Sequence, residues 1–348
     1  MRLYFLPAVL CLLLPSFAHA QDASGAQTQT QKNAEAAAKD KDDRNYVTLT
    51  HENDMFNGTD RYYTSGAQAS WFNVGTQVPD IIDDIAESIP TFDINESTST
   101  VYTLGQNLYT PEDIDTRIAD PDDRPYAAWL YGSVGLVTTT DQHVDEVEVT
   151  LGVVGPEALG EQTQKFIHEN ISDSPVPEGW DSQLDFEPGV VLSWQRRFPE
   201  MAAGQIGDLY VRAVPNVNVS LGNIYTYAGT GVSFTLGPYT GREQDTPPRV
   251  RPAVPGTGYF DTPEDEFSWF LFASLDARLM GRNIFLDGNT FKDGPSVDKK
   301  PLVGDASVGA AITFDDYRLS YSYNVRSKEF DGQDKASTFS AISLGLRF

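Results

Sequence analysis

Alternation of side-chain polarity with a period of two residues is the feature that most constrains the fold of this chain. From Asn45 onward, aromatic and β-branched residues alternate with small or polar ones in one segment after another. This pattern is typical of strands whose two faces meet different surroundings. Long amphipathic helical stretches are missing outside one place. The predicted strands are 45–54, 63–73, 99–110, 126–139, 145–155, 186–198, 207–221, 224–237, 266–279, 304–315, 316–328 and 337–348.

The last predicted strand shows the two faces most clearly. In STFSAISLGLRF, one face carries Ile342, Leu344, Leu346 and the terminal Phe348, and the other carries small or polar residues. A lipid-facing apolar stripe opposite a polar lumen has this form, and twelve is an even number, as a single-chain bacterial barrel requires. A soluble β-sandwich with one buried face is the alternative, because its strands alternate in the same way. The tyrosine-rich segment 317–325 and the C-terminal aromatic residue favour the barrel.

The N-terminus is typical of an export signal. Arg2 supplies a positive charge, residues 3–17 are mostly apolar, and 18–20 read Ala-His-Ala before Gln21. A transmembrane anchor is the alternative, but the run is short and ends in a small-residue cleavage site. We therefore predict a signal peptide over 1–20, a polar linker over 21–44 and an all-β fold over 45–348, namely a 12-stranded antiparallel transmembrane β-barrel of the Gram-negative outer membrane.

Charge and cysteine content exclude other classes of protein. The chain has 50 Asp and Glu against 25 Lys and Arg, a net charge of -25, so nucleic acid is not its main partner, because phosphate binding needs clustered cations. Cys11 is the only cysteine and lies in the predicted signal peptide, which argues against a disulfide-stapled scaffold. Such acidity favours divalent cations at a lipopolysaccharide surface. For the oligomeric state, which the sequence does not specify, we expect a monomer.

One insertion interrupts the strand pattern. Residues 156–185 form a long connection that we expect to be an extracellular loop, and Pro156 followed by Glu157 predicts a helix from Ala158 to Ile171. Gln164 and His168 are four residues apart and share one face of this helix. A surface histidine on a polar helix is the plain alternative. Long loops with their own helix are nevertheless often functional.

The connection between the first two predicted strands is rich in oxygen ligands. Residues 51–66 include Glu52, Asp54, Asp60 and two asparagines, and such donors suit a hard cation such as Ca²⁺. Ordinary loop chemistry explains the same composition. Strand alternation would place Asn53 and Asp54 on opposite faces. Either a bulge intervenes or a site here straddles the barrel wall near the membrane boundary, where a substrate could arrive from the outer leaflet.

Five motifs in order carry a resemblance to a known family. They are HENDMF (51–56), TDRYYTSG (59–66), DRPYAAWLYG (123–132), GVVGPEALGEQTQKFIH (152–168) and GWDSQL (179–184). Together they make the region from Asn45 to Phe348 resemble the outer-membrane lipid A 3'-O-deacylase family. The resemblance implies a 12-stranded barrel that hydrolyses the 3'-linked acyloxyacyl ester of lipid A with Ca²⁺.

The resemblance also implies site residues. Asn53 and Asp54 match the Asn-Asp pair at the end of the first strand, Thr64 matches the hydroxyl of the Tyr-Thr-x-Gly turn, and His168 matches the active-site histidine after Gln164. A lysine near the third strand of the best-known members is not matched. The nearest cation here is Arg117, which we expect to contact substrate instead.

Ester chemistry is compatible with these positions. We expect His168 to be the general base, Asp54 to ligate Ca²⁺, Asn53 and Thr64 to orient the metal, water or oxyanion, and Gln164 to position His168 or bind substrate. A Gly-x-Ser-x-Gly serine-hydrolase motif is missing from the sequence. The alternative function is a barrel without catalysis, either a small porin or a structural envelope protein. Its acidic residues would then only line loops and lumen.

Overall fold

The computed structural model describes most of the chain after residue 44. The described residues are 45–54, 62–74, 92, 94–95, 97–117, 120–170, 175–199, 201–238, 245–252, 256, 259–260 and 267–348. The predicted signal peptide and polar linker, residues 1–44, lie outside them.

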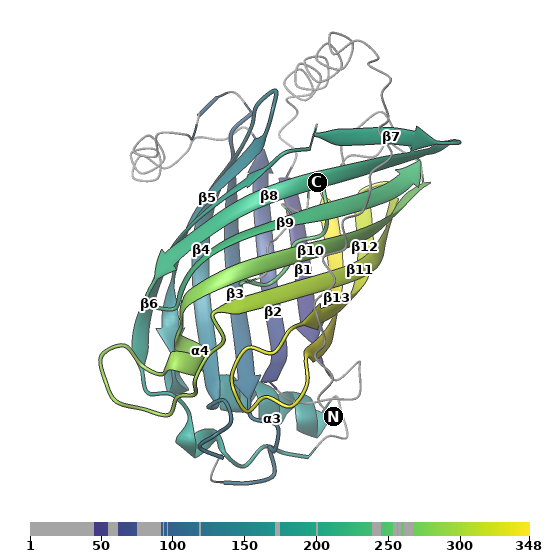
Figure 1. Cartoon of the computed structure of the whole chain (residues 1–348). Coiled ribbons are helices and arrows are strands. Elements are labelled where there is room, and N and C mark those ends of the chain that lie inside the picture. The colour runs from purple at the N-terminus through teal and green to yellow at the C-terminus, as the bar shows by residue number, and fades with distance from the viewer. Residues whose placement is uncertain are drawn as a thin grey trace, which may run out of the picture.

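Antiparallel strands make up most of the described chain (Figure 1). Their lengths of up to 17 residues suit tilted strands that cross a bilayer. The strands are β1 (Asn45–Asn53), β2 (Tyr62–Val74), β3 (Ser99–Thr110), β4 (Ala127–Thr139), β5 (Val144–Val154), β6 (Glu187–Arg197), β7 (Ala202–Ile206), β8 (Leu209–Gly222), β9 (Tyr225–Pro238), β10 (Phe267–Asn283), β11 (Leu302–Phe314), β12 (Tyr317–Arg326) and β13 (Ser337–Arg347).

Twelve of these strands close into a ring. Neighbours pair in chain order, β1 pairs with β13, and β6 pairs with β8, so each of the twelve has two partners. Backbone hydrogen bonds of 2.9 Å in both directions join Asn45 to Phe348 at one end of the barrel. We call this the terminal end and the opposite one, which carries the helices, the helical end. The predicted 12-stranded antiparallel barrel is confirmed.

Strand β7 is the one strand of the described chain that the alternation did not predict. It pairs only with β8 and stands outside the ring. All five of its residues are exposed. Neither face of β7 therefore requires apolar side chains, and its sequence shows no alternation of polar and apolar residues.

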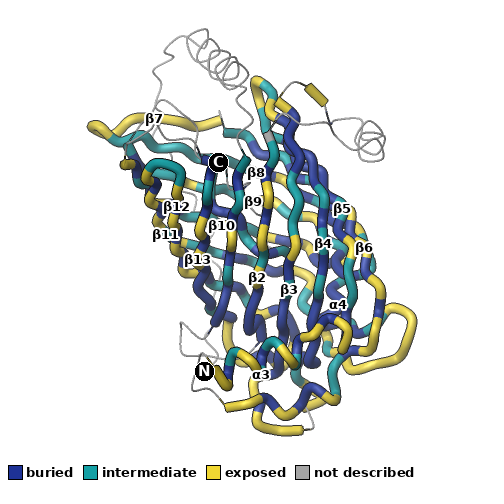
Figure 2. The backbone as a smooth tube through the Cα atoms, turned by 180° about the vertical axis from the view of Figure 1, so that it is seen from behind, coloured by how far each residue is buried: buried dark blue, intermediate teal, exposed yellow. Residues whose placement is uncertain are grey.

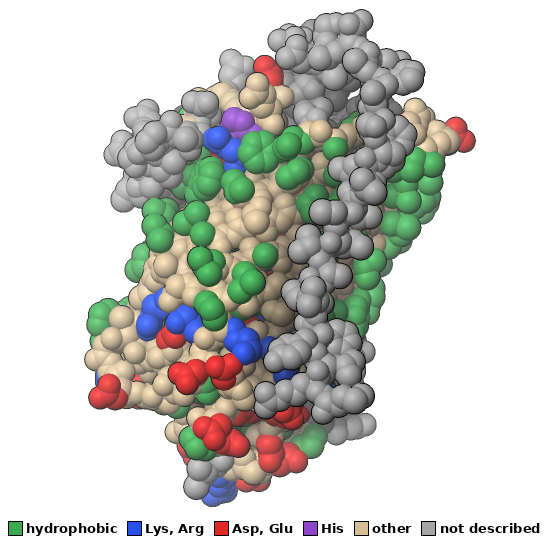
Figure 3. Space-filling view, in the orientation of Figure 1, with side chains coloured by type: hydrophobic (Ala, Val, Ile, Leu, Met, Phe, Trp, Pro, Cys, Tyr) green, Lys and Arg blue, Asp and Glu red, His purple; other side chains and the backbone are tan. Residues whose placement is uncertain are grey.

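The burial pattern is that of a membrane barrel rather than a soluble sandwich. Along β12 the large residues face outward and the polar ones inward: Leu319 is 47% exposed, whereas Arg318 is 2% exposed. A β-sandwich would show the reverse, because its apolar face lies in the core. Figure 3 shows hydrophobic side chains over the middle of the wall and charged ones gathered toward the helical end.

Four short helices accompany the strands in the described part of the chain. They are the 3₁₀ turns η2 (Pro156–Ala158) and η3 (Trp180–Ser182) and the α-helices α3 (Gly160–Asn170) and α4 (Ile284–Asp287). The predicted helix from Ala158 is wrong at its start. Leu159 has a left-handed φ of 60° and separates η2 from α3, and the predicted last residue, Ile171, lies outside the described residues. Of the described helices, none is both long and apolar enough to cross a membrane.

Side chains fill the lumen at the helical end. An aromatic and aliphatic core there includes Tyr109, Trp129, Tyr225 and, from α4, Phe285. The Tyr109 ring stacks on the Phe285 ring at 4.2 Å, and its hydroxyl lies 2.6 Å from that of Tyr225.

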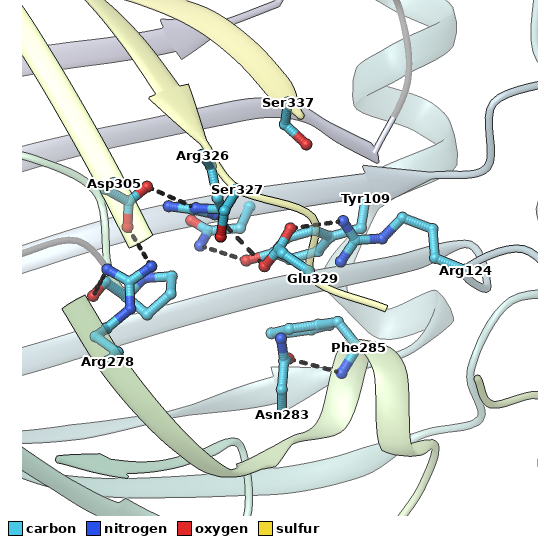
Figure 4. A network of polar contacts seen from close by, with 12 residues as sticks. Tyr109, Arg124, Arg278, Asn283, Phe285, Asp305, Arg326, Ser327, Glu329 and Ser337 are labelled. Carbon is cyan, nitrogen blue, oxygen red and sulfur yellow. Dashed lines mark hydrogen bonds and ion pairs between the residues drawn. The ribbon is translucent and has the colours of Figure 1, made fainter. Parts of the chain in front are cut away.

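A buried series of alternating charges crosses the same region (Figure 4). Arg278 pairs with Asp305, and Asp305 accepts a 2.9 Å hydrogen bond from Arg326. Glu329 accepts a 3.3 Å bond from Arg124 and lies 3.9 Å from Arg326. Opposite charges alternate along the series, so each buried charge has a partner, which burial requires.

The connection between β9 and β10 also enters the barrel. Its described residues, 245–252, 256 and 259–260, touch inward-facing residues of strands around the ring, and we call them the lumenal loop. Near the terminal end, Arg318 donates to the carbonyls of Asp245 (2.9 Å) and Tyr259 (3.2 Å). At greater depth, Arg251 donates to Glu148 at 2.7 Å. The alternation of the strands gave no sign that a loop occupies the lumen.

Candidate active site on the outer wall of the barrel

Three predicted site residues meet where β1 ends and β2 begins. Asn53 is the last residue of β1 and stands opposite Ser65 of β2. The Asp54 amide donates to the Thr64 carbonyl at 3.4 Å. Thr64 lies at a register shift between β2 and β3, and its hydroxyl is 2.6 Å from that of Thr110. The structure therefore brings Asn53, Asp54 and Thr64 together, with Thr110 as a neighbour that the sequence did not reveal.

The register shift is a β-bulge at Thr64, in the strand that pairs with β1. Opposite Leu108 and Thr110 of β3, the extra residue lets both Thr64 and Ser65 face the same side. The bulge lies in β2 rather than between Asn53 and Asp54.

Asn53, Thr64 and Thr110 of this cluster lie on the outer face of the wall. Glu52 points into the lumen, where Arg249 of the lumenal loop donates to it at 2.8 Å. Asn53 follows directly and so faces the other way. Asn53 is nevertheless only 5% exposed, whereas Leu49 on the same face is 53% exposed. Outward residues at the helical end are therefore covered, and those further down the strand are open to lipid.

The loop between β5 and β6 covers the outer face of β3 and β4. Leu108 and Ala128, which face outward, form a small core with Tyr126, Ala158 and Trp180. Figure 2 draws α3 in front of the lower ends of β2 and β3. The Gln106 side chain, also outward on β3, donates to the Ala158 carbonyl at 2.6 Å. Successive outward residues of β3 thus connect the helical loop to Thr110 and Thr64.

Helix α3 begins against this wall. A Cβ atom at Gly160 would lie 2.5 Å from Cβ of Ala128 and 2.6 Å from the Trp180 ring. Only glycine allows this close approach, because any side chain would push the helix away. Gln164 and His168 lie on the buried face of α3, while Phe166 is 60% exposed. The predicted common face of Gln164 and His168 is present.

Both buried side chains of α3 are oriented by polar contacts within the loop. The Trp180 indole donates to Gln164 Oε1 at 2.9 Å. His168 Nδ1 lies 2.5 Å from the Pro175 carbonyl oxygen. A carbonyl can only accept, so Nδ1 carries the proton and Nε2 is the basic nitrogen of the neutral ring. The sequence did not predict the partners Trp180 and Pro175, and the only signal for Trp180 was its place in the motif GWDSQL.

Arg117 lies apart from these groups. Its side chain is 83% exposed and contacts Glu178 at 3.4 Å on the surface of the helical end. The described contacts do not connect it with Asn53, Asp54, Thr64 or His168.

The oxygen donors at the end of β1 are of the type that calcium prefers. A carboxylate from Asp54, an amide oxygen from Asn53 and a hydroxyl from Thr64 are all hard ligands. Within the described part of the chain, no three His, Cys, Asp or Glu side chains form a cluster that could hold a metal. A calcium ion here would thus combine one carboxylate with neutral oxygens, which fits Ca²⁺ better than a softer metal.

Comparisons with known proteins agree with this architecture. Residues 6–348 match the family model described as "Outer membrane protein LpxR". The structure superposes on LpxR from Salmonella typhimurium with a TM-score of 0.69 and 19% sequence identity, over 86% of this chain and 99% of that chain. No curated protein sequence matches significantly.

Two autotransporter domains are more distant. The β domain of Bordetella BrkA superposes with a TM-score of 0.41 and 9% identity, over 88% of this chain and 98% of that one. The translocator domain of NalP from Neisseria meningitidis gives 0.36 and 11%, over 94% and 98%. Neither adds to the argument. The Salmonella structure supports the barrel fold, and the family model spans almost the whole sequence. The chain therefore belongs to the LpxR family of outer membrane proteins and is a β-barrel of the Gram-negative outer membrane.

Proposed function

We propose that this protein is a Ca²⁺-dependent lipid A 3'-O-deacylase. The observation that carries the proposal is a set of buried polar residues, Asn53, Thr64 and Thr110, on the outer face of the wall, the same face against which the loop with the oriented histidine packs. A lipid-facing wall has no structural need for buried polar groups, since lipid favours apolar side chains there. Membership of the LpxR family supports the same activity.

The location suits a substrate that stays in the membrane. Both ends of the barrel chain lie at the terminal end, and we assign the helical end to the cell surface, where lipid A occupies the outer leaflet. Lipid A would reach the site sideways along the wall without entering the lumen. Exposed Leu159 and Phe166 on the helical loop would contact its acyl chains, and exposed Arg117 would contact its phosphate.

His168 acts as the general base. Its Nε2 takes a proton from a water molecule that attacks the 3'-ester carbonyl carbon. The bond between this carbon and the sugar oxygen then breaks, and the proton passes from Nε2 to the departing oxygen to give the free 3'-hydroxyl and a fatty acid. Trp180, through Gln164, holds the helix face that presents the ring.

Asn53, Asp54 and Thr64 serve the carbonyl side of the reaction. Asn53 and Thr64 donate hydrogen bonds to the negative charge that develops on the carbonyl oxygen. Asp54 would hold a calcium ion, which when bound would supply positive charge to stabilise the oxyanion. We infer that these groups meet His168 around the substrate, because α3 begins against Ala128 of β4, two strands away from β2. Between Gly160 and His168, α3 rises about 12 Å, and β2 lies about 10 Å from β4.

A porin is disfavoured by the contents of the barrel. The lumenal loop, α4 and the buried charge series occupy the interior, and a barrel of twelve strands has little space to spare. A structural envelope protein would not need the buried polar groups on the outer wall.

Lipid A mass spectrometry tests the proposal. Cells with hexa-acylated lipid A should lose the 3'-acyloxyacyl mass when they express the wild-type chain, and His168→Ala should abolish the loss. His143→Ala is the matched control, because His143 lies beside Asp145 at the terminal end and its removal should leave deacylation unchanged. Unaltered lipid A from cells with an inserted, heat-modifiable wild-type barrel would contradict the proposed function.

A further inference from the structure

The lumenal loop reaches from the terminal end of the barrel toward the helical end, where the candidate site lies. At its base, Asp245 pairs with Arg197, and its amide donates to the Tyr259 carbonyl at 3.1 Å, so the loop enters and leaves at the same place. The Tyr46 ring near the start of β1 lies 5.5 Å from that of Phe260. Val250, in contrast, contacts Glu52 near the end of β1. Tyr46 and Glu52 are about 20 Å apart along the strand, so the loop spans much of the lumen.

The tip of the loop holds one carboxylate from two directions. Glu52 Oε1 accepts a 2.8 Å hydrogen bond from Arg249 Nε and a 3.0 Å bond from the Val250 amide. Glu52 is fully buried. Across the strand pair, Gly66 stands opposite Glu52, and a Cβ atom there would lie 3.1 Å from Val250. The tip therefore packs against the pair Glu52 and Gly66, immediately before the pair Asn53 and Ser65.

The wall fixes the tip in turn. Arg251 donates to Glu148 at 2.7 Å and to Glu146 at 3.2 Å. Asn107 donates to the Arg251 carbonyl, and Arg278 donates to the Pro252 carbonyl, both at 3.0 Å. Three strands, β3, β5 and β10, thus hold the residues that follow Arg249. Because several strands hold the tip in place, the tip can support the end of β1 and does not merely fill the lumen.

We propose that Arg249 is a positioning residue for the active site, a role that rests on the proposed function. It holds the end of β1 from inside the lumen through Glu52, so that Asn53 keeps its place on the outside and Asp54 stays beside Thr64. Neighbouring residues of a strand lie on opposite faces and share a backbone, so a shift of Glu52 moves Asn53 with it. This support is needed because the bulge at Thr64 interrupts the regular pairing of β2 with β3 beside the site.

The test separates positioning from general stability. Arg249→Met removes the ion pair at the tip, and Arg197→Met is the matched control, because it removes the ion pair at the base of the same loop. Purified proteins are assayed for kcat and KM on lipid A and for hydrogen exchange of the β1 amides. Arg249→Met should lower kcat about tenfold or more, as misplaced catalytic groups do, with KM within about twofold. Arg249→Lys, which keeps the charge, should recover part of kcat.

Hydrogen exchange reports the position of the strand without relying on activity. Arg249→Met should speed exchange at Glu52 to Asp54 about tenfold, and Arg197→Met should leave it unchanged. If Arg249→Met fails to fold because Glu52 is left as a buried unpaired charge, the double variant Glu52→Gln with Arg249→Met removes both charges and should show the same faster exchange.

Three outcomes would count against the inference. Wild-type exchange in the Arg249 variants overturns it, as does wild-type kcat in those variants, or an equal loss of kcat in Arg197→Met. A wild-type protein inert toward lipid A would instead contradict the proposed function, and the exchange measurement would still decide whether Arg249 holds the strand end.

Discussion

At the scale of single residues, a few contacts orient the side chains of Thr64 and His168 in the candidate site. Thr64 meets Thr110 because the bulge turns an extra side chain outward. The Pro175 carbonyl determines which nitrogen of His168 is basic. The sequence predicted Asn53, Asp54, Thr64, Gln164 and His168 through a family resemblance, but it could not show Thr110, Trp180 or Pro175. These partners are defined by contacts between separate segments, which no local pattern encodes.

Replacement of the Thr64 hydroxyl should affect catalysis more than folding. Thr64→Val keeps the shape and removes one donor, so we expect kcat to fall by about a hundredfold, as for loss of an oxyanion donor. Thr50→Val is the matched control, since Thr50 forms a similar buried hydroxyl contact of 3.0 Å with Ser343 inside the barrel. Both variants should lose about 1 kcal/mol of stability. Equal kcat values in the two variants would argue against a role for Thr64.

At the scale of elements, the strands were predictable and the inserted parts were not. Each barrel strand has one face toward lipid and one toward the lumen, so its side chains alternate between apolar and polar. The start and end of this alternation indicate the boundaries of the strand. β7 has no such contrast, because it is exposed throughout. The helix start was predicted too early because Leu159 adopts a left-handed conformation. The packing of Gly160 on Ala128 is a tertiary contact that helical propensity does not report.

The docking of α3 can be tested at Gly160. Gly160→Ala places a methyl group about 2.5 Å from Ala128, which should shift the helix and cost about 1–3 kcal/mol locally. We expect deacylation to fall at least tenfold and protease cleavage of the loop to speed up, while the barrel stays heat-modifiable. Gly204→Ala is the control, because a Cβ atom there meets no other atom within 4 Å. Unchanged activity of Gly160→Ala would mean that α3 need not lie so close to the wall.

At the scale of the whole molecule, the barrel has two surfaces with different tasks. In the proposed function the outer wall carries the active site, and the lumen, filled by aromatic side chains and paired charges, supports the wall. The sequence predicted the twelve strands of the barrel but not the lumenal loop. Arg249 and Glu52 are 197 residues apart in the sequence. No local pattern around either residue therefore indicates that the two form an ion pair.

A filled lumen should not conduct ions. Wild-type protein in planar bilayers should give no steady porin-like steps. Replacement of residues 246–258 by a short Gly-Ser linker should open a conducting path, because Asp245 and Tyr259 already lie within one hydrogen bond of each other. Steady conductance of the wild-type barrel would contradict the closed lumen and favour the porin alternative.

The central claim is that the site on the outer wall hydrolyses the 3'-ester of lipid A with the help of calcium. The most direct measurement is the mass spectrum of hexa-acylated lipid A after incubation with purified wild-type protein, with calcium added or chelated. We expect loss of the 3'-acyloxyacyl chain with calcium, at least a hundredfold slower release under chelation, and no release by Asp54→Ala in either condition. Equal release with and without calcium, or by Asp54→Ala, would contradict the role of Asp54 as the calcium ligand. Intact lipid A from the folded wild-type protein in calcium would contradict the claim as a whole.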